Sequence, residues 1–210
     1  MYKLFVKRLI DIILALIAMI PAGVVMLVVA PIIYFTDRGT VFYNASRMGM
    51  NGKVFKMYKF RSMRMNAPDL RNADGSTYNG EDDPRVTKIG KIMRKTSIDE
   101  LPQILNVLKG DMSIVGPRPN LATGNYAEFD EVRKKRLTVR PGITGYSQAY
   151  FRNSITQDEK FANDCYYVDN ISFLMDVKIV VRTAMSVLMR KNIYVNNSNQ
   201  TDKEKVSVKK

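Results

Sequence analysis

The 210-residue sequence contains no histidine, no tryptophan and only one cysteine, Cys165. Without histidine, the chain cannot form a Ser-His-Asp triad, a histidine general base or a histidine-ligated metal site. A single cysteine forms neither an internal disulfide nor a thiolate zinc site, and without a histidine to activate it Cys165 is a poor nucleophile. If the protein performs covalent chemistry, its candidate nucleophiles are therefore carboxylates and hydroxyls.

Acidic residues are scarce relative to basic ones. The chain has 20 Asp and Glu against 33 Lys and Arg, which gives a formal net charge of +13 and a pI near 9.8. Such an excess indicates an anionic partner, which could be nucleic acid, anionic lipid or a phosphorylated substrate. The hydrophobic share of 46% is sufficient for a core, and the length suits one compact domain with a small appendage.

Charged residues are absent altogether from Ile12 to Phe35. As a helix, this run would extend roughly 36 Å, which exceeds the ~30 Å hydrocarbon core of a bilayer. It is too long for a cleaved signal peptide and has no small-residue cleavage site before a polar start, so we expect it to stay attached. The sequence therefore predicts an N-terminal membrane helix.

Pro21 lies near the middle of this run, with Gly23 just after it, and predicts a kink. Basic residues flank both ends, and the positive-inside rule places both flanks on the cytoplasmic side. A re-entrant helix that turns at Pro21 and returns to the same face satisfies both observations. The alternative is a kinked single-pass anchor, since prolines do occur inside membrane spans. The flanking basic residues are Lys3, Lys7, Arg8, Arg38, Arg47, Lys53 and Lys56.

The rest of the chain predicts a small, mainly helical α+β domain with a β-hairpin and amphipathic interfacial helices. Asn51-Gly52 between apolar segments is a strong hairpin signal. The other expected segments are a loop at 66–83, helices at 86–95, 102–109, 126–137 and 172–191, a short buried run at 113–115 and a turn at 140–142. We expect a membrane helix over residues 1–36, one domain over 37–191 and a disordered polar tail over 192–210.

The segment KMYKFRSMR carries four basic side chains after the hairpin turn. They could belong to a strand that faces solvent or lipid headgroups, or they could form a phosphate-binding edge. The four residues are Lys56, Lys59, Arg61 and Arg64.

Asp99 and Glu100 stand side by side in these basic surroundings. One interpretation is structural, because Ser97 and Glu100 fit the S-x-x-E pattern of a capping box and Asp99 would then favour the positive end of that helix. In the other, a helix begins at Pro102 and leaves both acids in the approach turn, facing a helix N-terminus, which attracts phosphate.

The second interpretation allows a specific chemistry. A carboxylate can attack phosphorus and form an acyl phosphate. The repulsion between the two anions must then be offset by a divalent metal, Mg²⁺ by ligand type, and by arginines such as Arg94 and Arg118. The neighbouring acid could act as a base or orient the other groups.

Several long motifs resemble the small monotopic phosphoglycosyl transferases of bacteria, the polyprenyl-phosphate sugar-1-phosphate transferase family. The resemblance runs from about Lys7 to Lys191, and it is strongest to the enzymes that start N-glycan assembly with a bacillosamine-type sugar. The motifs are KRLID at 7–11, GKVFKMYKFRSM at 52–63, RVTKIGKIMRKTSIDELPQ at 85–103, NVLKGDMSIVGPRP at 106–119, RPGITG at 140–145 and DCYYVDNISFLMDVKI at 164–179.

The resemblance implies transfer of a sugar-1-phosphate, with an N-acetylated sugar expected, from a UDP-sugar to undecaprenyl phosphate with release of UMP. This would be the first membrane step of glycoconjugate assembly, at the cytoplasmic face of the bacterial inner membrane. Asp99 is then the nucleophile and the Mg²⁺ ligand, and Glu100 assists the attack of the lipid phosphate. The phospholipid membrane is an expected partner, nucleic acid is not, and a homodimer is left open.

Seven further residues are implied to bind substrate. The family resemblance assigns phosphate to Arg94, the nucleotide border to the Pro-Arg-Pro loop, and a looser phosphate role to the others. They are Lys59, Arg61, Arg94, Pro117, Arg118, Pro119 and Arg140.

One departure concerns the membrane helix. The family commonly breaks it at a Ser-Pro pair, whereas this chain has Ile20-Pro21, so a hydroxyl that could satisfy a freed carbonyl is missing. The angle of the hairpin is therefore open.

Two other functions remain compatible with the sequence. One is a membrane-anchored binding protein without turnover, although no helix-turn-helix, zinc or RNA-binding signature is visible. The other is a transferase that binds both substrates together and forms no covalent intermediate. The sequence indicates neither the sugar nor the pathway.

Overall fold

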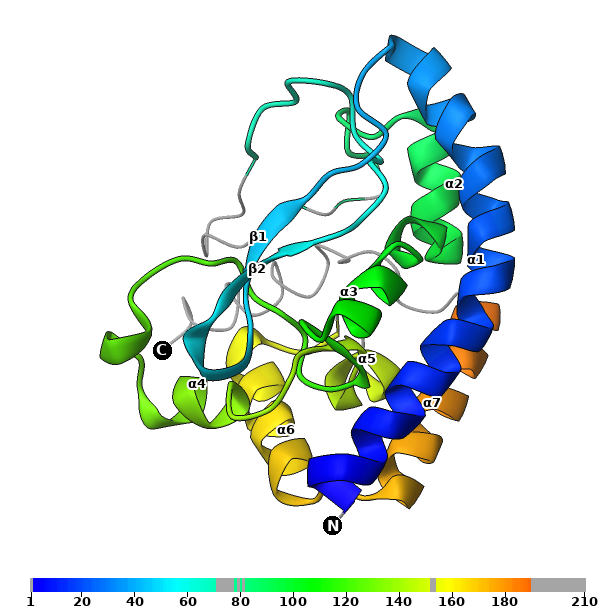
Figure 1. The fold of residues 1–210 in the computed structure, drawn as a ribbon. Helices are drawn as coiled ribbons and strands as arrows, with labels where there is room; N and C mark the ends of the chain where they lie inside the picture. The colour runs from blue at the N-terminus through cyan, green and yellow to red at the C-terminus, as the bar shows by residue number, and fades with distance from the viewer. Residues whose placement is uncertain (1, 71–77, 79, 81, 152–153, 190–210) are drawn as a thin grey trace.

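The computed structural model describes residues 2–70, 78, 80, 82–151 and 154–189. It has a mixed helix and strand fold, in which the long helix α1 (Lys7–Asp37) follows a short π-helix and borders the rest of the molecule (Figure 1). The other α-helices are α2 (Lys88–Thr96), α3 (Gln103–Lys109), α4 (Glu131–Arg136), α5 (Tyr146–Tyr150), α6 (Gln157–Asp169) and α7 (Phe173–Leu188). The strands are β1 (Ala45–Met48), β2 (Val54–Met57), β3 (Ser113–Val115) and β4 (Gly142–Thr144).

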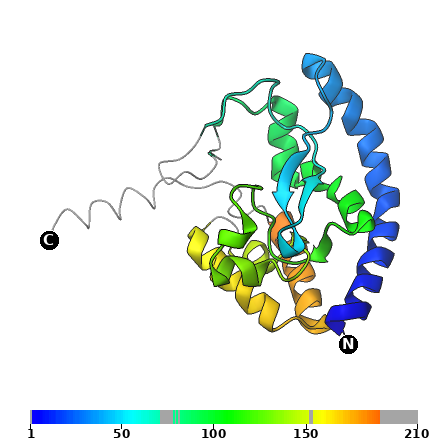
Figure 2. The same cartoon turned by 60° about the vertical axis from the view of Figure 1, so that its left-hand side comes forward.

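Helix α1 runs without interruption through Pro21 and Pro31. Both prolines are exposed, and two views show the helix bowed around the other elements (Figures 1 and 2). A proline removes one helical hydrogen bond, which accounts for a bend. By length and composition α1 could cross a membrane. The helix bends but does not reverse its direction at Pro21, so the re-entrant hairpin is not confirmed.

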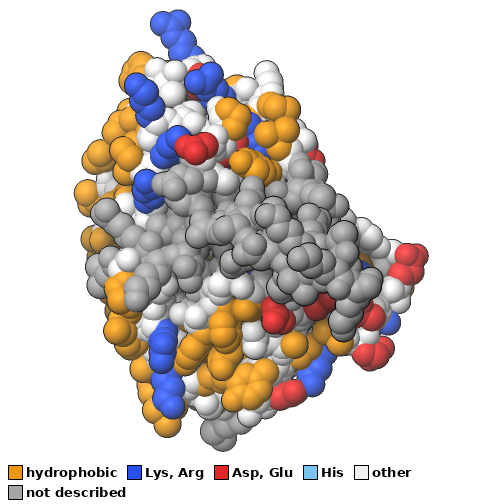
Figure 3. Space-filling model, turned by 180° about the vertical axis from the view of Figure 1, so that it is seen from behind, with side chains coloured by type: hydrophobic (Ala, Val, Ile, Leu, Met, Phe, Trp, Pro, Cys, Tyr) orange, Lys and Arg blue, Asp and Glu red, His pale blue; other side chains and the backbone are white. Residues whose placement is uncertain are grey.

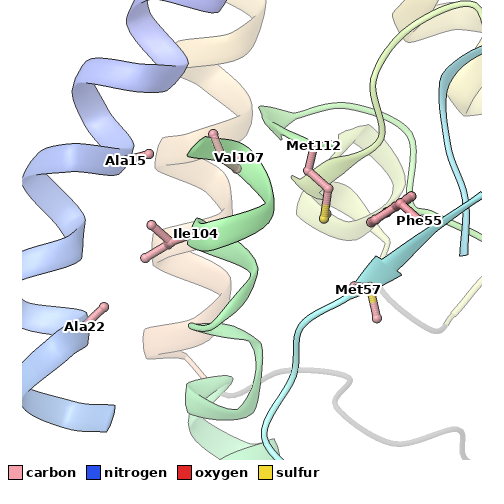
Figure 4. Packing of buried hydrophobic residues seen from close by; sticks show 7 residues of the cluster. All are labelled: Ala15, Ala22, Phe55, Met57, Ile104, Val107 and Met112. Atoms are coloured by element: carbon pink, nitrogen blue, oxygen red, sulfur yellow. The ribbon is translucent and has the colours of Figure 1, made fainter. Parts of the chain in front are cut away.

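The inner face of α1 packs against α3. Its buried residues are spaced four or seven apart and so lie on one side of the helix: Asp11, Ala15, Ala22, Val29 and Ile33. The two alanines face Ile104 and Val107 of α3, next to Phe55, Met57 and Met112 (Figure 4). Small side chains at these positions let the helices approach closely.

Polar contacts attach both ends of α1 to the same domain. Near the N-terminal end, the buried carboxylate of Asp11 accepts hydrogen bonds from the Ser113 hydroxyl at 2.7 Å and the Ile114 amide at 3.0 Å. At the C-terminal end, Asp37 forms an ion pair with the buried guanidinium of Arg61. Because buried charges require partners, these contacts fix α1 against the domain at both ends.

The predicted hairpin is confirmed. Strands β1 and β2 pair antiparallel, with Ala45 opposite Met57 and Met48 opposite Val54. Asn51 and Gly52 have φ angles of 53° and 78°, the left-handed region that a tight turn of this kind requires.

Asn106 of α3 ties the end of β2 to that helix. Its fully buried side chain accepts from the Tyr58 amide and donates to the Lys56 carbonyl, both at 2.8 Å. The chain is thereby held in place just before Lys59.

The predicted short helices are confirmed with shifted ends, except for one. Helices α2, α3 and α7 lie where they were expected, and Gly110 ends α3 with a φ of 97°. The single helix predicted over 126–137 is wrong. A 3₁₀ turn covers Tyr126–Glu128, and Asp130 then caps a separate helix α4 by accepting from the Arg133 amide at 2.7 Å. Helices α5 and α6 were not predicted.

Strand β3 confirms the predicted buried run at 113–115, and it pairs in parallel with β4. Strand β4 begins at Gly142, inside the expected turn. A Cβ atom at Gly142 would lie 2.1 Å from the Gly116 nitrogen. The two backbone segments therefore approach at a distance that only glycine allows. The Gly142 amide also donates to the Pro117 carbonyl at 3.0 Å, which holds the start of the Pro-Arg-Pro loop.

Apolar side chains gather along the edge of the molecule that α1 and α7 form, as the view from behind shows (Figure 3). An exposed apolar surface of this extent marks a membrane or protein contact. The most exposed of these residues are Leu9, Leu16, Ile17, Ile20, Val24, Leu27, Val28 and Phe35 of α1, and Phe173, Leu174, Val181 and Met185 of α7. The predicted tail at 192–210 and part of the predicted loop at 66–83 lie outside the described residues.

Candidate active site

A sharp turn between α2 and α3 carries Asp99 and Glu100. Ser97 ends α2 in the left-handed conformation, with a φ of 57°, and the chain continues as a 3₁₀ turn over Ile98–Glu100. Within the described residues, the Ser97 side chain makes no cap hydrogen bond. The capping-box interpretation is therefore wrong, and the acids lie in the approach to α3, which Pro102 precedes.

Asp99 is buried, with 2% of its surface exposed, and it forms an ion pair with Lys59. The Lys59 Nζ lies 2.7 Å from Asp99 Oδ2 and 3.5 Å from Glu100 Oε1. The backbone supports this pairing, because the Phe60 amide donates to the Asp99 carbonyl at 2.9 Å. With Asn106 holding Tyr58, Lys59 is fixed from both sides.

Glu100 forms a second ion pair with Arg118, whose Nη2 donates to Glu100 Oε1 at 3.1 Å. Arg118 stands between the buried residues Pro117 and Pro119, and the following proline restricts its backbone to extended conformations. The two adjacent carboxylates therefore share Lys59, and Glu100 has Arg118 as a second cation.

A buried ion pair between α4 and α6 contacts the backbone of the Pro-Arg-Pro loop. Arg136 Nη2 lies 2.7 Å from Asp164 Oδ2, and the same nitrogen donates to the Arg118 carbonyl at 2.7 Å. Arg136 and Asp164 have 3% and 4% of their surfaces exposed, and the guanidinium also lies over the Phe161 ring. This arrangement fixes the carbonyl of Arg118 and hence the direction in which its side chain leaves the loop.

The two acids are placed in different electrostatic surroundings. Burial raises the pKa of Asp99, with the charge of Glu100 adding to this effect and Lys59 opposing it. Burial also acts to raise the pKa of Glu100, but Arg118 and Lys59 outweigh it and hold that pKa well below its ordinary value. Glu100 is thus firmly ionised, while the charge of Asp99 is poorly solvated, as suits a nucleophile.

Asp99 and Glu100, called the dyad from here on, border a cleft in the protein surface. Arg94 and Pro119 border the same cleft. The Arg94 Nε donates to the Ser62 hydroxyl at 3.0 Å, and its charge lowers the pKa of Asp99. The structure therefore brings together Lys59, Arg94, Asp99, Glu100 and Arg118.

Two of the predicted substrate-binding residues, Arg61 and Arg140, make contacts within the protein, and their predicted role stays a prediction. The Arg61 guanidinium binds Asp37 and the Thr40 carbonyl, so it ties the end of α1 to the domain although its side chain borders the cleft. The Arg140 Nε donates to the Gly110 carbonyl at 3.0 Å, at the end of α3.

The cleft has a volume of about 1620 Å³, which exceeds the ~300–1,000 Å³ typical of small-molecule sites. Its lining includes basic side chains next to the dyad and the uncharged polar side chains of Thr144, Ser147, Gln148, Thr183 and Ser186. It offers room for an extended anionic substrate with a polar, uncharged part.

Sequence reasoning missed three residues of this cleft. Arg136 and Asp164 are 28 positions apart, and no local pattern predicts their pairing. Arg47 was counted only among the basic flanks of the membrane helix. Its position in β1, whose register is set by the predicted hairpin, was the available signal.

The dyad fits a magnesium ion that is bound partly by protein carboxylates and partly by the phosphates of a substrate. Among the described residues, no group of three or more acidic or cysteine side chains could form a complete protein cage for a metal. Mg²⁺ is commonly bound by one or two carboxylates together with substrate phosphates, and Asp99 and Glu100 offer these. Lys59 contacts Asp99 Oδ2, and among the described residues no side chain contacts Oδ1.

Comparison with known proteins places the chain in a family. Residues 2–190 match the family model described as bacterial sugar transferase, so the chain belongs to the bacterial sugar transferase family and is a transferase.

The relatives include proteins of the chain's own length and longer ones. The uncharacterized sugar transferase EpsL of Bacillus subtilis is 41% identical over 92% of this chain and 93% of its own length. The undecaprenyl-phosphate galactose phosphotransferase of Salmonella typhimurium is 38% identical over 90% of this chain and 42% of its own length. An Aeromonas hydrophila protein named UDP-N-acetylgalactosamine-undecaprenyl-phosphate N-acetylgalactosaminephosphotransferase is 40% identical over 88% of this chain and 44% of its own length.

The chain thus spans less than half of the length of the Salmonella and Aeromonas relatives. Their names refer to galactose and N-acetylgalactosamine, so the expected similarity to bacillosamine-type enzymes is not confirmed.

Proposed function

We propose that the protein transfers a sugar-1-phosphate from a UDP-sugar, with an N-acetylated sugar, to undecaprenyl phosphate and releases UMP. The observation that carries the proposal is the buried carboxylate of Asp99, held on Lys59 beside the Glu100–Arg118 pair in a large basic cleft. The names of the Salmonella and Aeromonas relatives support the acceptor and the kind of donor.

In the first step, the Asp99 carboxylate attacks the phosphorus that carries the sugar. A bond forms between an Asp99 oxygen and this phosphorus, and the bond from phosphorus to the bridging oxygen of the diphosphate breaks. The bridging oxygen keeps the electron pair and leaves as part of UMP. The product is an aspartyl-phosphosugar, and the cations Lys59, Arg94 and Arg118 offset the charge of the two reacting anions.

In the second step, an oxygen of undecaprenyl phosphate attacks the same phosphorus. The bond to Asp99 breaks, which restores the carboxylate and yields undecaprenyl diphosphate carrying the sugar. Glu100 favours this step by orienting cations rather than by taking up a proton, because an acid with a strongly lowered pKa is a weak base.

Mg²⁺ is part of the proposal. Asp99 would hold it, with Glu100 beside it, and the bound ion would neutralise charge on the phosphate oxygens.

The protein is further proposed to lie on the cytoplasmic face of the bacterial inner membrane, with the bowed helix α1 inserted into one leaflet so that both of its ends lie on the cytoplasmic side. The exposed apolar edge of α1 and α7 supports membrane contact (Figure 3). The contacts of Asp11 and Asp37 support the topology, because both ends of α1 bind one folded domain. A helix that crossed a ~30 Å core would place its ends on opposite sides of the membrane.

The test is release of UMP by the protein in nanodiscs with undecaprenyl phosphate, Mg²⁺ and UDP-sugars that carry galactose, N-acetylgalactosamine, N-acetylglucosamine or a bacillosamine-type sugar. Release that requires both lipid and metal establishes the reaction and identifies the donor. Asp99→Asn should reduce the rate by about 10³-fold or more, since a covalent route depends on its nucleophile.

Incubation with a radiolabelled donor and no lipid should trap the label on wild-type protein and not on Asp99→Asn. Turnover without any trapped label, at an unchanged rate in Asp99→Asn, would instead indicate direct transfer between the two substrates.

A further inference from the structure

Arg47 extends from β1 into the cleft, and its guanidinium has no hydrogen-bond or ion-pair partner in the described part of the chain. Its Nε is buried, and no described residue accepts a hydrogen bond from it. The side chain borders the same cleft as Asp99, Glu100 and Arg118. Neither the predicted motifs nor the proposed mechanism gives this residue a role.

Backbone contacts fix Arg47 beside the Pro-Arg-Pro loop. The Met48 amide donates to the Asn120 carbonyl at 3.0 Å, the Ala122 amide donates to the Ser46 carbonyl at 3.3 Å, and Arg47 pairs antiparallel with Leu121. Strand β1 therefore runs along the segment that follows Pro119. The position of Arg47 is set by this pairing and not by a flexible loop.

The electrostatic surroundings of Arg47 are unfavourable for a cation. Burial lowers its pKa, and the charge of Arg118 lowers it further, while Tyr43 and Glu100 oppose these effects weakly. Glu100 is already paired with both Arg118 and Lys59. Lys59 and Arg118 thus already pair with the two carboxylates, and Arg47 adds a further positive charge that a bound anion would balance.

A partly buried guanidinium without a partner costs free energy, because it has lost water and gained no counter-charge. Arg118, which is paired with Glu100, borders the same cleft, so an oxyanion bound between Arg47 and Arg118 would give Arg47 the counter-charge that it lacks. Guanidinium groups suit phosphate in particular, because their fork of N–H donors matches two phosphate oxygens.

We propose that Arg47 and Arg118 form a subsite for a phosphate group, beside Asp99 rather than at it. The inference rests on the proposed function for the identity of the ligand, which is the phosphate of the nucleotide or that of the prenyl phosphate. Both sources present the same anion, and binding experiments separate them.

The experiment measures binding by calorimetry to the full chain in nanodiscs, with UMP as one probe and farnesyl phosphate as the other. Arg47→Gln should weaken one or both probes by about 10- to 100-fold, the effect of losing a hydrogen bond to a charged group. Arg47→Lys should retain part of the affinity, because it keeps the charge and loses the fork. The control is Lys53→Gln, which removes an equal charge from an exposed position of the same hairpin and should bind like wild type.

Weaker binding of UMP alone assigns the subsite to the nucleotide, and weaker binding of farnesyl phosphate alone assigns it to the lipid. Loss with both probes assigns a shared phosphate subsite. Unchanged affinity for both in Arg47→Gln, an equal loss in Lys53→Gln, or no binding of either probe to wild type overturns the proposal. Thermal unfolding of each variant shows whether a loss of affinity comes from misfolding. If Arg47→Gln is misfolded, the affinity of Arg47→Lys compared with that of wild type tests the proposal.

Failure of the proposed function gives a different result. If the proposed function is wrong, wild-type protein releases no UMP, whatever its affinities for UMP and farnesyl phosphate are. If turnover is present, Arg47→Gln should raise the KM of the substrate whose phosphate it binds, whereas Asp99→Asn removes kcat. A change in kcat alone would contradict a binding role for Arg47.

Discussion

At the scale of single residues, two neighbouring acids are distinguished by the cations that meet them. Asp99 is buried and contacts one ammonium group, whereas Glu100 is partly exposed and contacts both Lys59 and Arg118. The first is therefore the less stable anion and the second the more stable one. These contacts suit Asp99 to act as a nucleophile and Glu100 to stay ionised and orient the neighbouring cations.

Glu100→Gln tests this division of roles. The change keeps the shape and removes the charge that holds Arg118 and Lys59 in place, so turnover should fall by about 10²-fold while the protein stays folded. UMP release and thermal unfolding measure the two effects. A fall in melting temperature with full activity at low temperature would mean that Glu100 is only structural. Asp169→Asn, which disrupts an exposed ion pair with Lys135, serves as the control.

Asp83 provides a pH test away from the dyad. Its buried carboxylate binds the Arg85 guanidinium through both oxygens, and these hydrogen bonds lower its pKa. A lowered pKa in the folded state means that the pair stabilises the fold above the unfolded pKa of about 3.9. This stabilisation is lost as the pH falls through the folded value. Asp83→Asn should therefore melt below wild type at pH 7 and approach it near pH 3, and a constant difference across this range would be the contrary result.

The sequence predicted the central residues of the site because they are close in the chain or belong to long motifs. Asp99, Glu100 and Arg94 lie within seven positions, and the turn before Pro102 had been one of two interpretations. The roles of Arg61 and Arg140 were not predictable in this way. Their partners, Asp37 and the Gly110 carbonyl, lie 24 and 30 positions away, and a basic residue in a motif does not reveal what it contacts.

At the scale of elements, the loop that carries Arg118 is positioned by helices that sequence patterns did not place. Helix α6 was missed, and α4 was predicted as part of a longer helix. Both helices begin at a cap that the sequence contains but that was not used for prediction: Asp130 caps α4, and Thr156 caps α6 in a capping box with Glu159. Elements marked by strong local signals, such as Asn51-Gly52 and Gly110, were found.

Asp164→Asn tests the support that α4 and α6 give to this loop. Removing the charge leaves Arg136 buried without its counter-ion, which should cost about 3 kcal/mol or more of stability. If Arg136 acts on the reaction through Arg118, the kcat/KM of Asp164→Asn should also fall by about 10-fold. Urea unfolding measures the first effect and UMP release the second.

A double-mutant cycle separates stability from positioning. In an Arg118→Ala background, Asp164→Asn should cost the same stability but little further activity, because the side chain it positions is already gone. Full additivity of the two losses in kcat/KM would show that the pair does not act through Arg118.

At the scale of the whole molecule, the position of α1 relative to the domain supports the proposed topology. One face of this helix packs on α3, while its other faces expose apolar side chains (Figures 3 and 4). A helix that is bound to one domain at both ends cannot cross a bilayer unless that domain is divided or enters the membrane. Shallow insertion, with the domain on one side, satisfies the apolar surface and the polar contacts together.

Thiol labelling of the two flanks tests this arrangement. Starting from Cys165→Ser, single cysteines are introduced by Lys3→Cys and Asn44→Cys, both at exposed positions on either side of α1. In intact spheroplasts, a membrane-impermeant maleimide should label neither variant, and lysis should make both reactive. Reactivity of one flank before lysis would mean that α1 crosses the membrane. In that case the contacts of Asp11 and Asp37 could not both exist in the bilayer.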